Sequence, residues 1–336
     1  MPRVRRVDCS GPGIRRVRRG RGFSYEDEGR RIEDSEVLER IAELAIPPAW
    51  TDVWICSDPR GHIQATGIDG ADRKQYLYHD DWRAHRDRDK FERMLEFARK
   101  LPGMRKQLDA DLRLRGMKER RVLACVAKLL DLGFFRIGGE RYAAENESFG
   151  LATLRRKHVE VNGKRVLFDF PAKSAKRHVR EIADPSVLPT IRTLMKRKGG
   201  GHELFAYRSG NGWRDVTSAD INEYLKELTG DDFTAKDFRT WNATVLAAVA
   251  VAQAAEEKMS HTARKRVVND AVKQVAEYLN NTPAVCRSAY IDPRVFDRFD
   301  SGKSIRPSLE RISRSKDSGE FADREAIERA VRRLLA

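Results

Sequence analysis

The stretch KQVAEYLNNTPAVCRSAYI, residues 273–291, decides how the second half of this chain is interpreted. It predicts the end of one helix, a stop of two asparagines, and a second helix that begins after Thr282. Threonine is a favoured N-cap residue and proline fits the first helical position, so Thr282-Pro283 marks this start clearly. The second helix carries Tyr290 about two turns further on. A tyrosine at a helix end is most often a half-buried anchor, so a chemical role for it depends on the rest of the chain.

The composition predicts a polyanionic partner. The 336 residues carry a formal net charge of +15, with a sequence pI near 9.8. Nucleic acid is the usual partner of such a chain, and an anionic membrane surface is the alternative. No run of about 18 apolar residues is present, so we expect no transmembrane helix. The N-terminus lacks the apolar core of a secretory signal, so we expect a cytoplasmic protein that is associated with the nucleoid.

Several functional classes lack their sequence signals. The four cysteines form no CxxC pair and have no histidine at metal-ligand spacing, which predicts reduced thiols and no structural zinc. No P-loop motif occurs, so nucleotide hydrolysis is not predicted. No carboxylate cluster of a two-metal nuclease stands out either. We therefore expect no cofactor and no metal site.

Hydrophobic patterning predicts an α+β protein with a small β-rich N-terminal domain and a larger, mainly α-helical domain that carries a β-hairpin sheet. Residues 1–30 are predicted to be a disordered basic arm, because eight arginines stand against one aspartate in its first 22 positions. Residues 31–100 form the β-rich domain, in which alternating segments flank a Pro-Arg-Gly turn at 59–61. The sequence Leu-Pro-Gly at 101–103 predicts a helix end and the domain boundary.

Residues 101–300 are predicted to form the larger domain. An Asn162-Gly163 turn between two alternating segments is a strong hairpin signal. An apolar helix over 233–257 holds Arg239 in its first turns, where a buried arginine needs a partner. Residues 301–336 are predicted to be a tail, loose up to about residue 320 and then an amphipathic helix for which the sequence indicates no function beyond packing.

A chain of this kind could break a phosphodiester bond without metal. That reaction needs a nucleophile, cations over the nonbridging oxygens and an acid for the leaving oxygen. The sequence offers Tyr290 together with Arg136 in a glycine-rich loop, Lys173 in a hairpin turn and Arg239 at a helix start. Arginine suits bidentate phosphate contacts, and lysine can act as an acid when neighbouring cations lower its pKa. Spacing alone does not single out these four side chains among 66 basic residues.

A resemblance does single them out. In chain order the sequence contains FFRIGGERY (134–142), ENESFGLATL (145–154) with KHVEV (157–161), FDFPAKSAKRH (168–178), KDFRTWNAT (236–244) and NTPAVCRSAYI (281–291). Together these motifs resemble those of the small bacterial and poxvirus-type DNA topoisomerases IB. The likeness extends from about Ile41 to Arg298, and so covers both predicted domains.

The resemblance implies a role for each catalytic candidate. Tyr290 would be the nucleophile that forms a 3′-phosphotyrosyl link and leaves a free 5′-hydroxyl. Arg136 and Arg239 would neutralise the charge on the phosphorus centre, and Lys173 would protonate the leaving 5′-oxygen. Neither ATP nor an obligatory metal is implied, and double-stranded DNA would be the partner of a monomeric enzyme.

One position departs from the family pattern. Asn281 stands nine residues before the tyrosine, where the family usually has histidine. An asparagine can still donate a hydrogen bond to a nonbridging oxygen, but it cannot carry charge. The alternative is structural, because asparagine commonly ends a helix in the left-handed conformation. Both roles stay open at this point.

The N-terminal part of the resemblance implies a DNA-facing surface. It carries the side chains of Arg73, Lys74, Tyr76 and Tyr78, and Tyr142 of the larger domain is implied near the DNA backbone. The alternative is that the tyrosines merely cover the sheet.

Two other functions compete. A tyrosine recombinase uses the same residue types, but recombinases carry His-x-x-Arg at the second arginine, where this chain has Lys236. A non-catalytic basic DNA-binding protein would explain the charge equally well, but not the ordered motifs.

Overall fold

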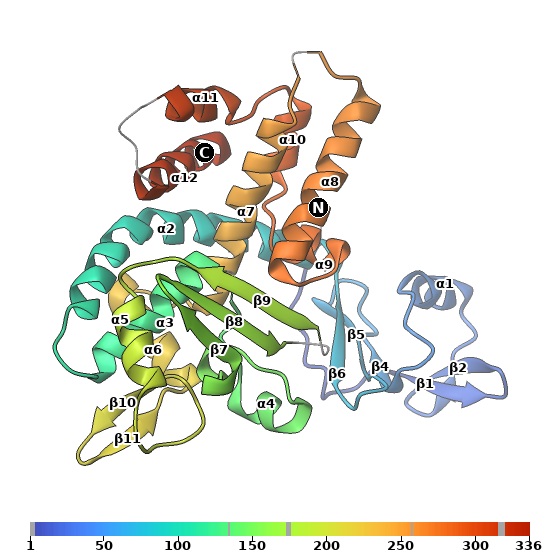
Figure 1. Cartoon of the computed structure of the whole chain (residues 1–336). Coiled ribbons are helices and arrows are strands. Elements are labelled where there is room, and N and C mark those ends of the chain that lie inside the picture. Colours follow the sequence, from blue (N-terminus) through green and yellow to red (C-terminus); the bar gives the residue numbers. More distant parts are fainter. Residues whose placement is uncertain (1–3, 134, 173–175, 257, 315–319) are drawn as a thin grey trace. The chain divides into compact units, whose positions relative to one another are not determined.

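The computed structural model describes residues 4–133, 135–172, 176–256, 258–314 and 320–336 (Figure 1). The chain divides into two compact units, Met1–Glu92 and Arg93–Ala336. The first unit is rich in strands, and the second is mainly helical with two small sheets. The predicted α+β class is therefore confirmed. No helix within the described residues is both long and apolar enough to cross a membrane.

The first unit is built on one antiparallel sheet with the strand order β3-β2-β1-β4-β5-β6. Its strands are β1 (Ile14–Arg19), β2 (Gly22–Asp27), β3 (Arg30–Arg31), β4 (Thr51–Ile55), β5 (Ile63–Ile68) and β6 (Lys74–Tyr78), and α1 (Ser35–Glu43) lies between β3 and β4. The predicted hairpin is confirmed, because β4 pairs with β5 and Ile55 lies opposite Ala65. Asp34 caps α1 by accepting from the Glu36 and Val37 backbone N–H groups.

The prediction of a disordered arm over residues 1–30 is wrong from residue 14 onwards, where the chain forms β1, β2 and the start of β3. Ile14 is buried in a core cluster with Ile41 and Ile55. The guanidinium of Arg16 donates to the carbonyl oxygens of Pro47 and Trp50, at 3.2 and 2.6 Å. One buried apolar side chain and one well-bonded arginine thus fix a strand that its composition alone does not indicate.

The predicted helix end at 101–103 is also wrong. Helix α2 runs from Asp80 to Leu112 with Pro102 inside it, and the division between the two units falls within this helix. Proline removes one backbone hydrogen bond of a helix. The helix nevertheless continues, because Leu101, Met104 and Leu108 bury one continuous stripe on either side of the proline.

The second unit contains the remaining helices. They are α3 (Glu119–Gly133), α4 (Glu140–Asn146), α5 (Leu188–Met195), α6 (Ser218–Thr229), α7 (Ala235–Gln253), α8 (His261–Leu279), α9 (Pro283–Ala289), α10 (Arg294–Asp300), α11 (Arg306–Arg314) and α12 (Glu320–Leu335). Helix α3 packs against α5, α6 and α7 and is buried over most of its length. Helices α7 and α8 lie against each other (Figure 1). The segment around residue 310 is helical, contrary to the prediction of a loose region, whereas the final helix is where the sequence places it.

Two small antiparallel sheets complete this unit. The first has the order β7-β8-β9, with β7 (Val159–Asn162), β8 (Arg165–Pro171) and β9 (Arg177–Ile182). The predicted Asn162-Gly163 turn joins β7 and β8, and Gly163 adopts a φ of 55°, which glycine tolerates. The second sheet pairs β10 (Ala206–Ser209) with β11 (Gly212–Asp215).

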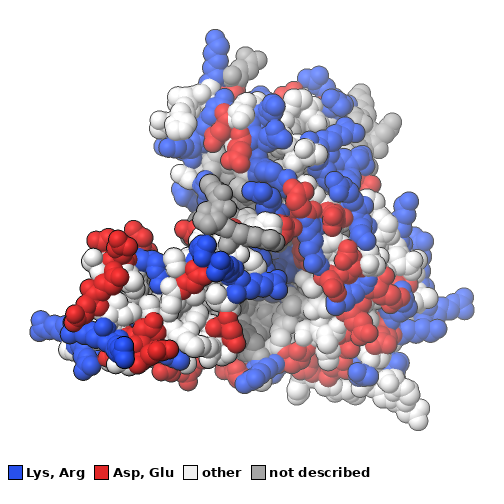
Figure 2. Space-filling view, turned by 180° about the vertical axis from the view of Figure 1, so that it is seen from behind, with Lys and Arg blue, Asp and Glu red and all other residues white. Residues whose placement is uncertain are grey.

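Basic side chains are frequent on one face of the protein (Figure 2). Figure 2 shows lysine and arginine distributed over the face that it presents, with acidic side chains between them. This distribution accords with the net charge of +15.

Candidate active site

Three of the predicted catalytic residues come from separate elements of the second unit. Arg136 follows the end of α3, Arg239 lies in the second turn of α7, and Tyr290 is the C-cap residue of α9. Two of these elements, α7 and α9, begin at a local signal. Thr234 caps α7 in a capping box with Asp237, and Thr282 caps α9 by accepting from the Val285 backbone N–H.

Arg239 is held in a buried position beside Tyr290. Its residue is only 4% exposed, and its Nη2 donates to the carbonyl oxygen of Leu279 at 2.9 Å. The guanidinium carbon lies 5.2 Å from the centre of the Tyr290 ring. The hydroxyl of Thr244, further along α7, donates to the Tyr290 carbonyl oxygen at 3.3 Å. Helix α7 therefore fixes both the arginine and the main chain of the tyrosine.

Arg136 is bonded to the turn between α8 and α9. Its Nη2 donates to the carbonyl oxygen of Asn280 at 3.1 Å and to the side-chain oxygen of Asn281 at 2.5 Å. The residue that ends α8 in the left-handed conformation is Asn280, with a φ of 53°, and not Asn281. The buried side-chain nitrogen of Asn281 has no hydrogen-bond partner in the described structure. This amide is thus oriented by Arg136 and keeps a donor for a further acceptor.

The two arginines make the Tyr290 phenol more acidic. Burial acts to raise its pKa, but the charge and hydrogen bonding of Arg239 and the charge of Arg136 outweigh that effect and lower it. Burial, with a further contribution from the charge of Arg136, lowers the pKa of Arg239 to about 10. Arg239 therefore remains a cation at neutral pH.

These side chains surround one hollow of about 330 Å³. Its lining residues are Arg136, Ile137, Gly138, Gly139, Ser148, Phe149, Ala235, Lys236, Arg239 and Tyr290. Gly138 and Gly150 approach each other so closely here that a side chain on either would collide with the backbone of the other. The arrangement presents cationic groups and a phenol to a common space, which suits a phosphodiester group.

Two predicted residues cannot be placed. Lys173 lies outside the described residues, although the hairpin that holds it is defined by Pro171 opposite Arg177. Tyr142 belongs to α4, but its side chain lies outside the described part of the structure. Both assignments stay predictions.

The four DNA-binding residues predicted in the first unit lie on or beside β6. The rings of Tyr76 and Tyr78 are stacked with their centres 6.1 Å apart, and they are 40% and 39% exposed. The Lys74 ammonium lies 5.7 Å from the Tyr76 ring, whereas Arg73 forms a 2.7 Å ion pair with Asp69. The tyrosines are therefore not buried in the sheet, and they present their rings together with one lysine.

Two neighbours of the cluster were not selected from the sequence as site residues. Lys236 lines the hollow one turn before Arg239, and its charge also lowers the pKa of Tyr290. The helical spacing of the two residues is the signal that could have shown this. His178 on β9 is buried between Phe135 and Phe170, and burial, with contributions from Arg180, Arg136 and Arg239, lowers its pKa to about 4.

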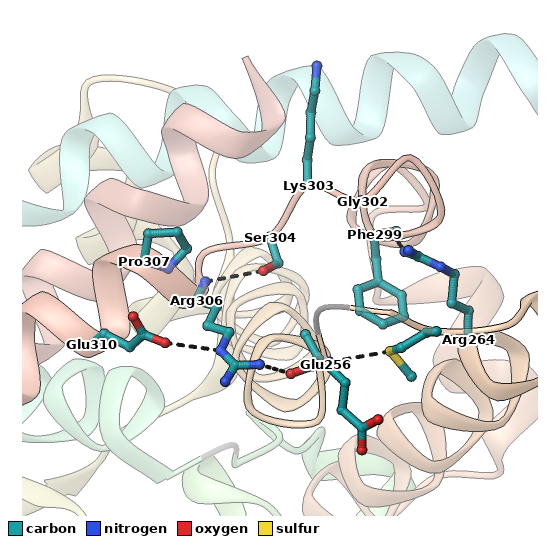
Figure 3. A pocket seen from close by; sticks show the side chains of 11 residues that line it. Glu256, Arg264, Phe299, Gly302, Lys303, Ser304, Arg306, Pro307 and Glu310 are labelled. Carbon is teal, nitrogen blue, oxygen red and sulfur yellow. Dashed lines mark hydrogen bonds and ion pairs between the residues drawn. The ribbon is translucent and has the colours of Figure 1, made fainter.

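A second hollow, of about 550 Å³, contains none of the predicted residues (Figure 3). Arg306 there donates to Glu310 at 3.0 Å and also contacts the carbonyl oxygen of Ala255. Arg264 donates to the carbonyl oxygen of Phe299 at 2.5 Å. Both arginines are thus bonded to groups of the protein, where they connect neighbouring segments. We therefore do not take this hollow as the candidate site. Within the described residues, no group of three or more His, Cys, Asp or Glu side chains could hold a metal ion.

The chain is similar to known DNA topoisomerases over most of its length. Residues 79–314 match the family of the eukaryotic DNA topoisomerase I catalytic core, and residues 22–69 match the bacterial DNA topoisomerase IB N-terminal domain. DNA topoisomerase 1B of Acanthamoeba polyphaga mimivirus is 33% identical over 289 residues, which cover 83% of this chain and 85% of that protein. DNA topoisomerase I of Monkeypox virus is 21% identical over 274 residues, or 79% and 82% of the two chains. DNA topoisomerase 1 of Candidozyma auris is 32% identical over 156 residues, which cover 44% of this chain and 20% of that protein.

These matches, on a helical unit that carries two arginines and a tyrosine around one hollow, define the protein as a DNA topoisomerase. More narrowly, the chain belongs to the type IB DNA topoisomerase family. The family resemblance seen in the sequence is thereby confirmed. The match to the catalytic core ends at residue 314, so helix α12 lies beyond it.

Proposed function

We propose that the protein relaxes supercoiled duplex DNA by breaking and rejoining one strand through Tyr290. The observation that carries this proposal is the convergence of Arg136, Arg239 and a phenol of lowered pKa on one hollow. Such a phenol releases its proton more readily, which makes its oxygen a better nucleophile.

The proposed reaction is a balanced exchange of two phosphodiester bonds. The Tyr290 oxygen attacks phosphorus and forms a new P–O bond, while the bond from phosphorus to the 5′-oxygen breaks. The phenol loses its proton to solvent water, and the 5′-oxygen gains one, which we assign to Lys173. Rejoining reverses each step, with the 5′-hydroxyl as nucleophile and the tyrosine as leaving group.

The cations stabilise the charge that develops during this exchange. Arg136 and Arg239 are positioned to neutralise the nonbridging oxygens, and guanidinium groups suit that contact because they donate in a planar fork. The side-chain nitrogen of Asn281 supplies a neutral donor in addition. Because each bond broken is replaced by a bond of the same kind, the cycle needs no ATP.

Strand rotation follows from the covalent link. While the 3′ end is held on Tyr290, the free 5′ end can turn about the intact strand, so supercoils of either sign are released. We further propose that one chain performs this cycle as a monomer, in the cytoplasm and on the nucleoid. The tyrosine recombinase alternative would need Lys236 to replace the histidine of that class, and the architectural alternative leaves the cluster of Tyr290 with the buried Arg239 without a role.

Relaxation of supercoiled plasmid in EDTA without ATP tests the proposal. Wild type should relax the plasmid, and Tyr290→Phe should lose all measurable activity because it keeps the ring but removes the attacking oxygen. Tyr278→Phe is the matched control, since Tyr278 is 40% exposed on α8 and does not line the hollow. Denaturation during the reaction should trap a protein–DNA adduct through a 3′-phosphate in wild type only. Equal relaxation by wild type and Tyr290→Phe would contradict the assignment.

A further inference from the structure

Helix α12 is joined to three other helices by a cluster of polar side chains, here named the α12 network, all of them buried except Arg324, whose side chain is 25% exposed. Its members are Arg105 on α2, Asp131 on α3, Asn242 on α7, and Arg324 and Glu328 on α12. Arg105 donates to both carboxylate oxygens of Asp131, each at 2.9 Å. It also donates to both carboxylate oxygens of Glu328, at 2.7 and 2.8 Å. Two cations thus balance two carboxylates.

Arg324 connects the charged part of this network to α7. Its Nη2 donates to a carboxylate oxygen of Asp131 at 2.7 Å and to the carbonyl oxygen of the same residue at 2.9 Å. The same nitrogen lies 3.4 Å from the side-chain oxygen of Asn242. The Asn242 side-chain nitrogen donates to the Asp131 carbonyl oxygen at 3.0 Å. Arg324 and Asn242 therefore hold the main chain of Asp131 between them.

The α12 network is too deeply buried to be an incidental surface pairing. The side chains of Asp131, Glu328 and Arg105 are 1%, 6% and 8% exposed. Charges at such depth persist only when they are paired and hydrogen-bonded. Burial acts to raise the pKa of Asp131, but the charges of Arg324 and Arg105 hold it below its usual value. Helix α12 is therefore part of the packed unit, and it supplies two of the four charged side chains of the network, Arg324 and Glu328.

Two members of the α12 network lie close in sequence to the two arginines of the candidate site. Asp131 is in the last turn of α3, five residues before Arg136. Asn242 follows Arg239 by three residues on α7, so the two share one side of that helix. A shift of Asp131 against Asn242 would change the distance between the two guanidinium groups.

We propose that Arg324 is a positioning residue of the cleavage reaction, which fixes the end of α3 against α7 and so sets the spacing of Arg136 and Arg239. These two cations repel each other across a partly buried space, and no phosphate is present to hold them before DNA binds. A rigid support behind them keeps the site in the arrangement that the phosphorus centre requires. A misplacement of about 1 Å can reduce a rate about a hundredfold.

The inference rests on the proposed function of Tyr290, and it is tested in single-turnover cleavage of duplex DNA at saturating enzyme. Arg324→Met should lower the cleavage rate constant by about 10- to 100-fold while DNA affinity changes little. The pH at which the rate reaches half its maximum should rise, because displaced arginines lower the phenol pKa less. Arg324→Lys, which keeps the charge, should recover part of the rate. Asn242→Ala, which leaves the four charged groups in place, should shift the pH profile in the same direction.

Arg329→Met is the matched control, because Arg329 lies on α12 but forms a pair with Glu325 in which the two side chains are 52% and 44% exposed. It should retain the wild-type rate and pH profile. A lower melting temperature in Arg324→Met and Asn242→Ala, with wild-type rates and pH profiles in both, would overturn the inference and leave only a structural role. That outcome is distinct from failure of the proposed function, which would appear as cleavage by Tyr290→Phe or its absence in wild type.

Discussion

At the residue scale, charge outweighs burial at Tyr290, the proposed nucleophile. Burial alone would raise the pKa of Tyr290, yet Arg239 and Arg136 bring it below its ordinary value. Burial and the same arginines also lower the pKa of His178, whose protonated form they disfavour. One cationic centre therefore favours the anion of the phenol and the neutral form of the imidazole, two states that both limit electrostatic repulsion around the arginines.

The low pKa of His178 predicts a pH-dependent stability. The folded pKa of about 4 is below the ordinary value of 6.5, so between these values the unfolded chain binds more protons than the folded one. The stabilisation is fully present above pH 6.5 and is lost as the pH falls towards 4, by about 3 kcal/mol in total. The glutamine in His178→Gln cannot be protonated. As the pH falls from 6.5 to 4, the free energy of unfolding of this variant should therefore decrease by about 3 kcal/mol less than that of wild type.

Urea unfolding of both proteins at several pH values between 4 and 6.5 measures the difference. Carboxylates titrate over the same range, but their contribution is common to both proteins and cancels. His202→Gln is the matched control, because His202 is exposed, and it should follow the wild-type curve. Parallel curves for wild type and His178→Gln would contradict the prediction.

Single site residues could be predicted where a sequence motif contained them, and not where their role depends on burial or backbone geometry. Tyr290, Arg136 and Arg239 could be selected through ordered motifs, and the structure brings all three to one hollow. The burial of His178 could not be foreseen, because the strand RHVREI places His178 and Arg180 on its inward side, where polar residues conceal the alternation. Likewise, only backbone geometry could show that Asn280 and not Asn281 ends α8.

At the element scale, tertiary contacts override two local signals. The arginine-rich sequence of β1 predicts disorder, but Ile14 and the bonds of Arg16 fix it in the sheet. The Leu-Pro-Gly sequence predicts a helix end, but the buried stripe of α2 continues through Pro102. Composition and a single helix-breaking residue indicate only local preferences. In both segments the tertiary contacts outweigh those preferences and determine the secondary structure.

The strand assignment of β1 predicts a stability difference between two substitutions in it. Ile14 is 2% exposed in the core of the first unit, so Ile14→Ala should lower the free energy of unfolding by about 2–4 kcal/mol. Arg18→Ala, on the same strand but exposed, should have little effect. Hydrogen exchange resolved by peptide reports on the first unit separately, through the protection of β1, β2 and β4. A disordered arm would leave both variants like wild type, and that result would contradict the strand.

At the scale of the whole molecule, the net charge of +15 predicts how the protein holds DNA. On the face that Figure 2 presents, basic side chains are widely spread rather than confined to one site. Binding that neutralises phosphates releases counterions, so affinity falls steeply as salt rises. The chemistry proposed at Tyr290, by contrast, would take place in a partly buried cluster, whose interactions salt screens much less.

Salt should therefore separate binding from the covalent step. For Tyr290→Phe, which binds without cleaving, we expect affinity for duplex DNA to fall by about a thousandfold or more between 50 and 200 mM salt, as for a protein that neutralises roughly six to ten phosphates. Fluorescence anisotropy measures this, with sucrose of equal osmolality as the control that should leave affinity unchanged. In wild type, concentrated salt added after cleavage should release the noncovalent fraction and leave the strands already joined to Tyr290. Affinity that did not change with salt would show that phosphate contacts do not dominate binding, because counterion release would then contribute too little to the complex.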